Sequence, residues 1–376
     1  MSETRLDQVY RPSHDEAARQ AFVGAFKAHV NGPLEDRLGD ALDHDLGPKF
    51  ERETGASPST REEATRALSP SPLYQTWGSL VYTSQDFLWE SVGDTVDRVR
   101  PIFEARAEEL AKNGPQYGSL TLNADLQPPE PIASREIHRQ PGGYFFETDG
   151  TDLTSPLLYF ASIELYRTAK GLGTGAATGE PAMAPYLLKL LGDRFPDIAP
   201  KRILDLGCGV GTETIALKQR FPDAEVHGLD LSGPFMRFGH LWAEEKGVEL
   251  HFRQGDARDT GYPDGHFDLI FSHILFHETG HEVLPAIMAE ARRLLAPGGV
   301  FFNADVAYQP DRIPPVKQAT NGWQVDYNGE PFWNGFADTD VKAQLTKAGF
   351  TEGGVFADYA PLGAGFYYLF GAQAAA

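Results

Sequence analysis

The feature that most constrains this chain is a short apolar strand that runs directly into a glycine-rich turn and then a helix. Residues 202–214 read RILDLGCGVGTET, and Ile203, Leu204 and Leu206 form the apolar run typical of a strand buried on both faces of a parallel sheet. The glycines of the turn, at alternate positions, are Gly207, Gly209 and Gly211. They permit unusual backbone angles and place no Cβ against a ligand. The helix expected at 213–220 begins at this turn, so its free N–H groups point at whatever binds there.

A second strand favours a nucleotide-like ligand over a tight turn that binds nothing. The stretch EVHGLD at 225–230 is a short apolar strand that ends in Asp230. This acid falls at about the distance downstream at which dinucleotide folds place the carboxylate that binds ribose hydroxyls. The dinucleotide fingerprint requires a third Gly or Ala where this chain has Thr212, which argues against a hydride-transfer enzyme.

The order of the motifs resembles the class I S-adenosylmethionine-dependent methyltransferases, and most closely their small-molecule branch of quinone and sterol enzymes. The first motif is the pattern of Asp205 with the three glycines, and Asp230 follows it. The resemblance continues in QGDA at 254–257, in the strand 267–272, and in the helix and Pro-Gly-Gly turn of 290–300. It covers about residues 180–375.

The resemblance implies a cofactor, S-adenosylmethionine, and a set of residues that bind it. Asp205 and the glycines would hold its methionine and ribose portion, Asp230 the ribose hydroxyls, and Asp256 with Ala257 the adenine edge. The full expected set is Asp205, Gly207, Gly209, Gly211, Asp230, Leu231, Asp256, Ala257 and Ser272. The resemblance also implies a seven-stranded sheet whose last strand is antiparallel.

From residue 180 onward strands alternate with helices, which predicts an α/β fold with a doubly wound, mostly parallel, Rossmann-like sheet. Strands are expected at 202–206, 225–229, 248–253, 267–272, 299–305, 353–358 and 364–371. Helices are expected at 182–194, 213–220, 234–246, 282–295 and 338–348. A ligand of such a sheet lies at the carboxyl ends of the strands, where Asp205, Asp230, Asp256 and Ser272 are predicted to fall.

The preceding residues, 1–179, predict a mainly α-helical region that caps the substrate or joins two subunits, and a homodimer through these helices is one possibility. Helices are expected at 14–30, 73–92, 94–112 and 155–169, and a strand or edge hairpin at 142–147. Ser13 is the expected N-cap of the first helix. The aromatics of 73–92 are core residues or a pocket wall, and the glycine-rich run 171–179 is a hinge, a lid or a bare linker.

The segment after the fourth strand carries the main competing motif. His277, Glu278 and His281 match the H-E-x-x-H pattern of zinc peptidases, and His273 would share their face if the run were helical. Gly280 weakens such a helix by about 1 kcal/mol, so we expect no metal and keep a zinc-dependent hydrolase only as the weakest alternative.

The resemblance gives the same segment a use beside the methyl group. A histidine such as His277 could take the proton of an acceptor hydroxyl, with Glu278 orienting its ring and His273 nearby. The alternative for each histidine is a packing or capping role. The expected catalytic residues are therefore His277, Glu278 and His273.

The insertion 306–337 carries aromatic residues among Pro and Gly, which predicts a substrate-covering wall or lid rather than disorder, with an intersubunit contact as the alternative. These aromatics are Tyr308, Trp323, Tyr327, Phe332, Trp333 and Phe336.

The composition of the chain limits the classes of molecule that we expect it to bind. The formal charge of −20 disfavours nucleic acid and anionic membranes, and the single Cys208 fits a reducing, cytoplasmic compartment. No apolar run is long enough to span a bilayer. The sequence thus predicts methyl transfer to oxygen, nitrogen or carbon of a partly apolar small molecule, the alternative being a binding protein without transferase activity.

Overall fold

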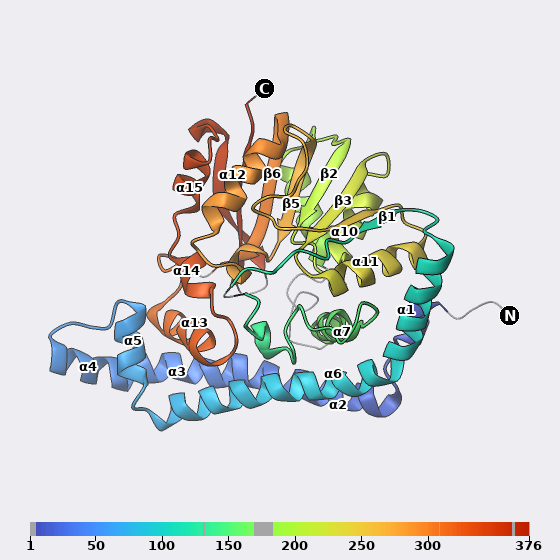
Figure 1. Cartoon of the computed structure of the whole chain (residues 1–376). Coiled ribbons are helices and arrows are strands. Elements are labelled where there is room, and N and C mark those ends of the chain that lie inside the picture. Colours follow the sequence, from blue (N-terminus) through green and yellow to red (C-terminus); the bar gives the residue numbers. More distant parts are fainter. Residues whose placement is uncertain (1–4, 131, 169–182, 308, 363–364, 376) are drawn as a thin grey trace.

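The computed structural model of the chain describes residues 5–130, 132–168, 183–307, 309–362 and 365–375. Its strands form a single twisted sheet flanked by helices, and a layer of long N-terminal helices lies beneath the sheet in the view of Figure 1. The chain therefore has two parts in contact, a sheet with its flanking helices and a helical layer.

The sheet has eight strands in the order β1-β4-β3-β2-β5-β6-β8-β7. They are β1 (Ser119–Thr121), β2 (Arg202–Leu206), β3 (Glu225–Asp230), β4 (His251–Gln254), β5 (Phe267–His273), β6 (Leu295–Val306), β7 (Val355–Leu362) and β8 (Gly365–Gln373). All pairs from β1 to β6 are parallel, and β8 is antiparallel to both neighbours, as expected for the last strand.

The predicted count of seven strands is wrong. The additional strand, β1, comes from the N-terminal region and pairs with β4 through Ser119 and His251. Three residues are too few for the period-of-two pattern by which a strand is recognised, so the sequence carries no signal for it. The predicted mostly parallel α/β architecture is confirmed.

Two apolar cores cover the two faces of the sheet. Ile203 and Phe271 face one core with Phe238, whereas Leu204 and Ile270 face the other with Leu294. Alternate residues of β2 are therefore buried on opposite sides, which explains its continuous apolar sequence. The helices around the sheet are α9 (Met183–Arg194), α10 (Thr212–Arg220), α11 (Gly233–Lys246), α12 (Leu284–Leu294), α13 (Pro315–Tyr327), α14 (Trp333–Ala337) and α15 (Val341–Lys347).

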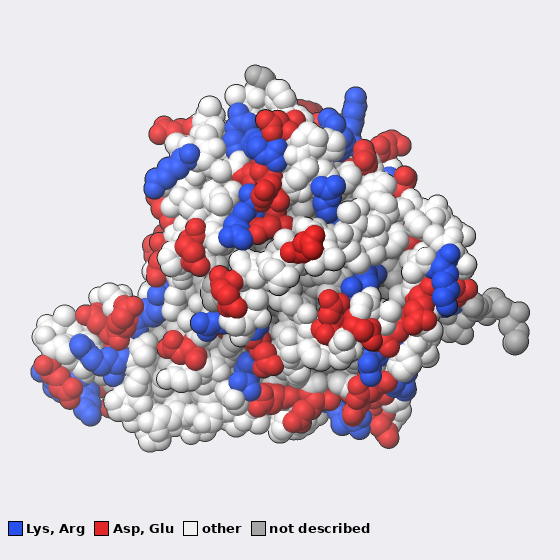
Figure 2. All heavy atoms as spheres, viewed as in Figure 1, with Lys and Arg blue, Asp and Glu red and all other residues white. Residues whose placement is uncertain are grey.

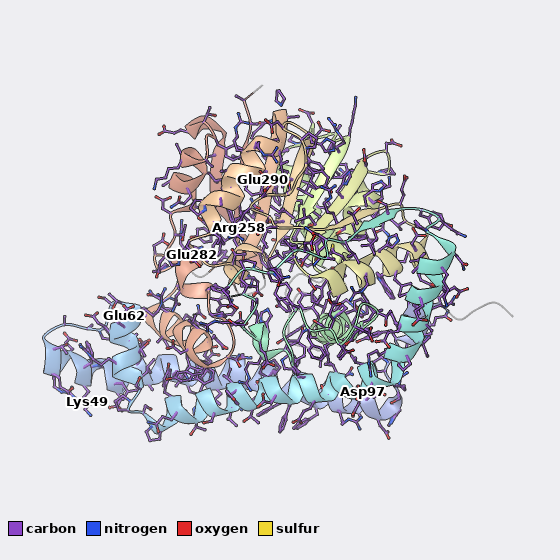
Figure 3. The ribbon with its side chains drawn as sticks, in the orientation of Figure 1. Lys49, Glu62, Asp97, Arg258, Glu282 and Glu290 are labelled. Carbon is purple, nitrogen blue, oxygen red and sulfur yellow. The ribbon has the colours of Figure 1, made fainter. Side chains whose placement is uncertain are left out.

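The N-terminal layer is built from α1 (Leu6–Val9), α2 (His14–His29), α3 (Glu35–Ala41), α4 (Gly47–Thr54), α5 (Arg61–Leu68), α6 (Pro72–Asn113) and α7 (Thr154–Thr168). Ser13 caps α2 in a capping box with Glu16, as predicted. The end of this layer that carries α4 and α5, with Lys49 and Glu62, projects beyond the sheet (Figure 3).

Two N-terminal predictions are wrong. The helices expected at 73–92 and 94–112 are one helix, α6, because buried Val92 and Val96 flank Gly93 and hold it in register against the core. The expected strand at 142–147 is a turn, in which Gly142 and Gly143 have φ of 77° and 66°. The glycine-rich run 171–179 lies outside the described residues.

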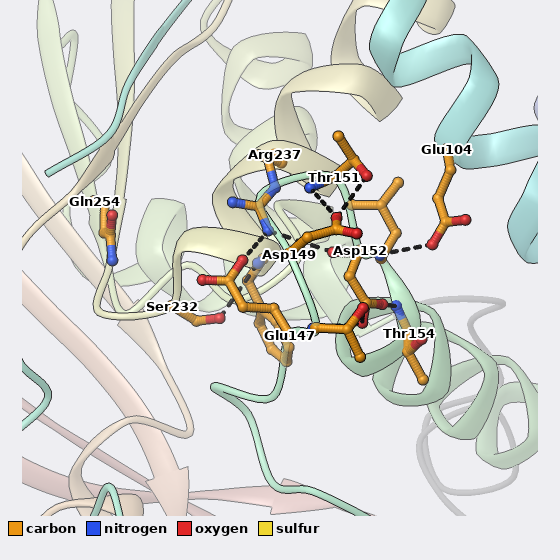
Figure 4. Close-up of polar contacts among 12 residues, drawn as sticks. Glu104, Glu147, Asp149, Thr151, Asp152, Thr154, Ser232, Arg237 and Gln254 are labelled. Carbon is orange, nitrogen blue, oxygen red and sulfur yellow. Dashed lines mark hydrogen bonds and ion pairs between the residues drawn. The ribbon is translucent and has the colours of Figure 1, made fainter. Parts of the chain in front are cut away.

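The helical layer is attached to the sheet through α11. Phe103 of α6 is fully buried and stacks on Phe238 and Trp242, with ring centroids 5.9 and 6.3 Å apart. Beside this contact, Arg237 pairs with Glu147 and donates to the Asp152 carbonyl at 3.3 Å (Figure 4). These contacts fix the loop before α7 next to the carboxyl end of β3.

Acidic and basic side chains are mixed over the visible face of the molecule rather than gathered in one patch (Figure 2). Among the described residues, no helix combines the length and apolarity that a membrane span requires.

Candidate functional site

The glycine turn between β2 and α10 is bound to the neighbouring strand by backbone hydrogen bonds. Gly207 and Gly209 have φ of 71° and 53°, a region that favours glycine. The Gly207 N–H donates to the Leu229 carbonyl at 2.8 Å, and the Gly209 N–H donates to the Asp230 carboxylate at 3.0 Å. Among the described residues, a Cβ on Gly209 would meet only Tyr159, at 3.7 Å, so no described side chain crowds the backbone here.

Asp230 lies at the end of β3 and faces the same space. Its second oxygen, Oδ1, accepts from the Ser232 N–H at 2.9 Å, and burial raises the pKa of the carboxyl. The glycine-turn cavity, as we name this space, brings together six of the nine expected cofactor residues: Gly207, Gly209, Asp230, Leu231, Asp256 and Ala257. Asp256 is also paired with Arg258, which lines the cavity too (Figure 3).

Three of the expected cofactor residues do not line this cavity. Asp205 is 1% exposed and accepts a hydrogen bond from Thr214 Oγ1 at 2.6 Å, and its burial raises its pKa to about 8. Gly211 lies against the ring of Phe252. Ser272 is buried and donates to Asn303 Oδ1 at 2.6 Å. Asp205 and Ser272 thus make contacts within the fold rather than with the cavity.

The expected catalytic residues follow β5 and take different positions. His273 and Glu278 line the glycine-turn cavity, whereas His277 does not. The His273 ring lies between Glu213 Oε1, at 3.2 Å, and the Tyr367 hydroxyl, at 2.9 Å. Ile274, which follows His273 in the chain, has a backbone φ of 50°, a value that is strained for a β-branched residue.

His277 is 3% exposed, and its Nδ1 lies 2.6 Å from Asp305 Oδ1 at the end of β6. Burial disfavours its charged form, but the neighbouring Asp305 and Glu278 carboxylates outweigh this and raise its pKa to about 10. Burial likewise disfavours the Glu278 carboxylate, but contacts with His138 and His277 hold its pKa well below the usual range. With this pKa His277 is protonated at neutral pH, and its ring contacts the carboxylates of both Asp305 and Glu278.

The zinc-peptidase arrangement is not formed. Residues Phe276–Glu278 make one 3-10 turn, not the α-helix that would bring His277 and His281 onto one face. The His281 side chain is 67% exposed and lies beside Glu282, away from His277. This excludes the site built on His277, Glu278 and His281.

Two residues that the sequence analysis did not single out complete the surroundings of Glu278. His138 Nε2 lies 2.7 Å from Glu278 Oε1, and His138 Nδ1 pairs with Glu330. One ligand atom from each of His138, His277, Glu278 and Glu330 lies within 4.8 Å of the others. His138 is in a segment without periodicity and Glu330 in the insertion, so no local pattern marks them. Asp305 does have a signal, because it lies at the carboxyl end of β6, a strand of the parallel part of the sheet.

A second, larger cavity adjoins the first. This helix-side cavity has a volume of about 800 Å³ and shares Tyr159 and Ile274 with the glycine-turn cavity. Its walls come from N-terminal helices, with Lys27, Gln85, Trp89 and Tyr166, and from the insertion, with Gln324, Glu330 and Trp333. The volume is in the range that holds a small organic molecule.

The insertion folds into α13 and α14 and contributes part of the wall of the helix-side cavity. Of its aromatics, Trp333 lines the helix-side cavity, whereas Trp323 packs on Trp77 and Tyr327 is exposed. Phe332 and Phe336 are buried in apolar clusters, and Tyr308 lies outside the described residues.

Comparison with known proteins places the chain among methyltransferases. A family model described as a methyltransferase domain matches residues 203–299. A demethylmenaquinone methyltransferase of Thermus thermophilus is 41% identical over 101 residues, which are 27% of this chain and 45% of that protein. An uncharacterized methyltransferase of Synechocystis is 30% identical over 159 residues, which are 40% of this chain and 67% of that protein.

The matches cover only part of most relatives. A malonyl-[acyl-carrier protein] O-methyltransferase of Halorhodospira halophila is 30% identical over 159 residues, 41% of this chain and 50% of that protein. The chain thus spans about half the length of the first curated relatives it matches. Among solved structures, the S-adenosylmethionine-dependent methyltransferase SibL in its apo form aligns over 92% of this chain and 96% of its own, with 17% identity and a TM-score of 0.45.

Proposed function

Because the chain belongs to the class I S-adenosylmethionine-dependent methyltransferases, we propose that it transfers the methyl group of S-adenosylmethionine to a small molecule in the helix-side cavity. The observation that carries the proposal is the meeting of the two cavities at Tyr159 and Ile274. A donor in the glycine-turn cavity and an acceptor in the other would then lie side by side.

The bound cofactor supplies a methyl carbon already activated by a sulfonium, so the protein's main task is alignment. Holding two reactants in line contributes up to about 7–11 kcal/mol. In our proposal Asp230 binds the ribose hydroxyls and Gly209 lets the cofactor approach the backbone, while the absence of a Cβ on Gly207 makes room for Leu275 in the cavity wall. Tyr159 and Ile274 separate and align the two ligands.

Of the three expected catalytic residues, Glu278 has the position best suited to contact an acceptor. It lines the glycine-turn cavity and pairs with His138, which lines the helix-side cavity. We assign it the hydrogen bond to an acceptor hydroxyl or amine. His277 positions it from the side of Asp305, and His273 holds the end of β5 against Tyr367.

The acceptor we propose is a partly apolar metabolite. Trp89, Tyr166 and Trp333 give the helix-side cavity aromatic walls, and Lys27 and Gln85 provide polar groups. Residues 1–179 act as its cap in this proposal. The net charge of −20 and the buried Cys208 favour a cytoplasmic protein that does not bind nucleic acid, and a homodimer through the N-terminal helices stays part of the proposal.

Calorimetric titration with S-adenosylmethionine and S-adenosylhomocysteine tests the cofactor assignment. Asp230→Ala removes a carboxylate that binds two hydroxyls, so we expect affinity to fall by about 1.5–3 kcal/mol, or about 10- to 150-fold. The exposed Asp223→Ala is the matched control and should bind normally. Equal affinity in the two variants would contradict the assignment.

Turnover separates the enzyme from its non-catalytic alternative. We expect S-adenosylhomocysteine to form when the protein and S-adenosylmethionine are incubated with small apolar acceptors that carry hydroxyl, amine or nucleophilic carbon groups. His277→Ala should retain cofactor binding and lose turnover. Tight cofactor binding without turnover across such a panel would favour a binding protein.

A further inference from the structure

Four side chains from three distant segments converge where the two cavities meet. His138 comes from the loop before α7, His277 and Glu278 from the turn after β5, and Glu330 from the insertion. Glu278 lines the glycine-turn cavity, whereas His138 and Glu330 line the helix-side cavity. We name these four residues the His–Glu cluster.

Both histidines of the cluster are held by carboxylates at one ring nitrogen. His277 Nδ1 lies 2.6 Å from Asp305 Oδ1, and His138 Nδ1 pairs with Glu330 Oε1. Histidines that bind metals characteristically donate their other ring N–H to a carboxylate in this way. The arrangement leaves Nε2 of each ring for the centre of the cluster.

The two Nε2 atoms approach the same carboxylate oxygen. Glu278 Oε1 lies 2.7 Å from His138 Nε2 and 3.4 Å from His277 Nε2. Ligand atoms that bind one ion at about 2.0–2.2 Å lie roughly 3–3.5 Å from one another. These two separations are therefore close to those of a site with two histidines and one carboxylate, and the ligand atoms of the whole cluster lie within 4.8 Å of one another.

The backbone of His138 is strained, and its position is fixed from two sides. Its φ is 53°, although it is not glycine. Its N–H donates to the Gly329 carbonyl at 2.8 Å, and its carbonyl accepts from Gln85 Nε2 at 2.8 Å and Trp89 Nε1 at 2.9 Å. Strain that the surroundings enforce in this way is concentrated at functional sites.

An ion would replace the protons of the two histidines, because only a neutral imidazole binds a metal. With both imidazoles neutral, the three carboxylates of Asp305, Glu278 and Glu330 leave the cluster with an excess of negative charge over the nearby Lys27. Glu330 Oε2 is buried and has no hydrogen-bond partner among the described residues. A buried carboxylate oxygen without a partner is costly, and a cation beside it offsets the cost.

We propose that the His–Glu cluster binds one divalent transition-metal ion through His138 Nε2, His277 Nε2 and Glu278, with Glu330 and Asp305 orienting the two histidines. Two imidazoles and a carboxylate without thiolate suit ions such as Zn²⁺, Fe²⁺ or Co²⁺ better than Mg²⁺ or Ca²⁺. The proposed site uses His277 and Glu278 of the H-E-x-x-H pattern, but its third ligand is His138 and not His281.

The location gives the ion a use that rests on the proposed methyl transfer. An ion between the two cavities would bind an acceptor hydroxyl oxygen and lower its pKa, so that its proton is released to solvent. The oxygen would then form a bond to the methyl carbon while the sulfur–methyl bond breaks, and S-adenosylhomocysteine is the leaving group. The binding of the ion itself does not depend on that activity, so the two proposals can fail separately.

Zinc binding to the full-length protein tests the site. Chelator-treated, dialysed protein is titrated with Zn²⁺, and bound metal is measured by equilibrium dialysis with elemental analysis. We expect about one equivalent in the wild type. Glu330→Gln, which keeps the shape of an outer partner, should weaken binding about 10- to 100-fold, and His138→Ala, which removes a ligand, should weaken it more.

His281→Ala is the matched control, because it changes the sequence motif but not the cluster, and we expect it to bind Zn²⁺ like the wild type. Titration of each variant with S-adenosylhomocysteine verifies folding, and Glu330→Gln remains informative if His138→Ala fails to fold. Visible absorption of bound Co²⁺ should change in Glu330→Gln and not in His281→Ala. The site would be overturned if the wild type bound no stoichiometric Zn²⁺. It would also be overturned if Glu330→Gln bound Zn²⁺ as tightly as the wild type, or if His281→Ala lost Zn²⁺ binding. Retained cofactor binding in those cases would leave the proposed function intact.

Discussion

The two cavities of the candidate site are built in different ways. The residues that line the glycine-turn cavity from the sheet lie within about seventy positions, from Gly207 to His273, at the ends of adjacent parallel strands, and Tyr144 and Tyr159 of the N-terminal region add to the lining. The helix-side cavity gathers Lys27, Trp89, His138 and Glu330 from segments separated by up to three hundred residues. The sheet side of the first cavity follows from strand pairing, whereas the second cavity exists only when the helical layer is packed on the sheet.

The largest effect we predict tests this packing. Phe103→Ala removes a fully buried ring of α6 that stacks on Phe238 and Trp242 of α11. Loss of such a ring leaves a cavity and lowers the free energy of unfolding by about 3–5 kcal/mol. Urea denaturation measures the loss, and hydrogen exchange should increase in α6 more than in the glycine turn.

The control for this variant is the adjacent Ile102→Ala, since Ile102 is 45% exposed and should change stability by less than about 0.5 kcal/mol. A loss below 1 kcal/mol in Phe103→Ala would mean that the helical layer is held on the sheet by other contacts. An equal increase in hydrogen exchange in α6 and in the glycine turn would mean that the two regions open together. The helical layer and the sheet would then not differ in the way proposed above.

The same contrast explains what the sequence could predict. Apart from α13 and α14 in the insertion, the strands and helices after residue 180 were predicted to within a few residues, because apolar periodicity and turn glycines are local signals. The end of β3 at Asp230 and the turn at Asp256 were placed correctly on one cavity for the same reason. Asp205 and Ser272 were not, because which face of a strand a side chain takes depends on packing, here against Thr214 and Asn303.

The helix-side cavity could not be predicted in this way. His138 lies in a loop without periodicity, and its position depends on hydrogen bonds to Gln85, Trp89 and Gly329, none of which is near it in sequence. The motif of His277, Glu278 and His281 was correctly set aside as a zinc-peptidase site, but two of its members joined a cluster that only the tertiary fold assembles.

The second prediction concerns a buried charge of the helix-side cavity. Lys27 is 3% exposed, and burial lowers its pKa from 10.5 to about 8, with Glu330 opposing the shift. Between these two values the unfolded state binds more protons than the folded state, so stability rises with pH across this window. Below about pH 8 both states are protonated and the cost is constant, on the order of 3 kcal/mol.

Lys27→Met removes this titration and should flatten the rise. We expect the stability difference between wild type and variant to shift by about 2–3 kcal/mol in favour of the wild type from pH 8 to 10.5, measured by urea denaturation. Exposed Lys49→Met is the control and should follow the wild type at every pH. Parallel pH profiles of wild type and Lys27→Met would show that Lys27 is not desolvated in the folded protein.

The smallest effect concerns the polar contacts between the loop before α7 and α11 (Figure 4). Arg237 pairs with Glu147 and donates to the Asp152 carbonyl, so Arg237→Gln releases the loop from the end of α11 nearest β3. Because Glu147 is partly solvated, the pair contributes no more than about 1 kcal/mol. We therefore expect amide exchange in residues 144–153 to increase up to about fivefold, measured by mass spectrometry.

The matched control is Arg167→Gln, which breaks a similar pair with Glu164, but one that lies within α7 and joins no two regions. It should leave exchange in 144–153 unchanged. If Arg237→Gln alone loosens this loop while cofactor affinity stays constant, the loop belongs to the helix-side half, because the glycine-turn cavity keeps its geometry from the strands. If cofactor affinity falls as well, Tyr144, whose carbonyl accepts from Ser232 at 2.7 Å, transmits the change to the glycine-turn cavity, and the two halves are less independent than their construction indicates.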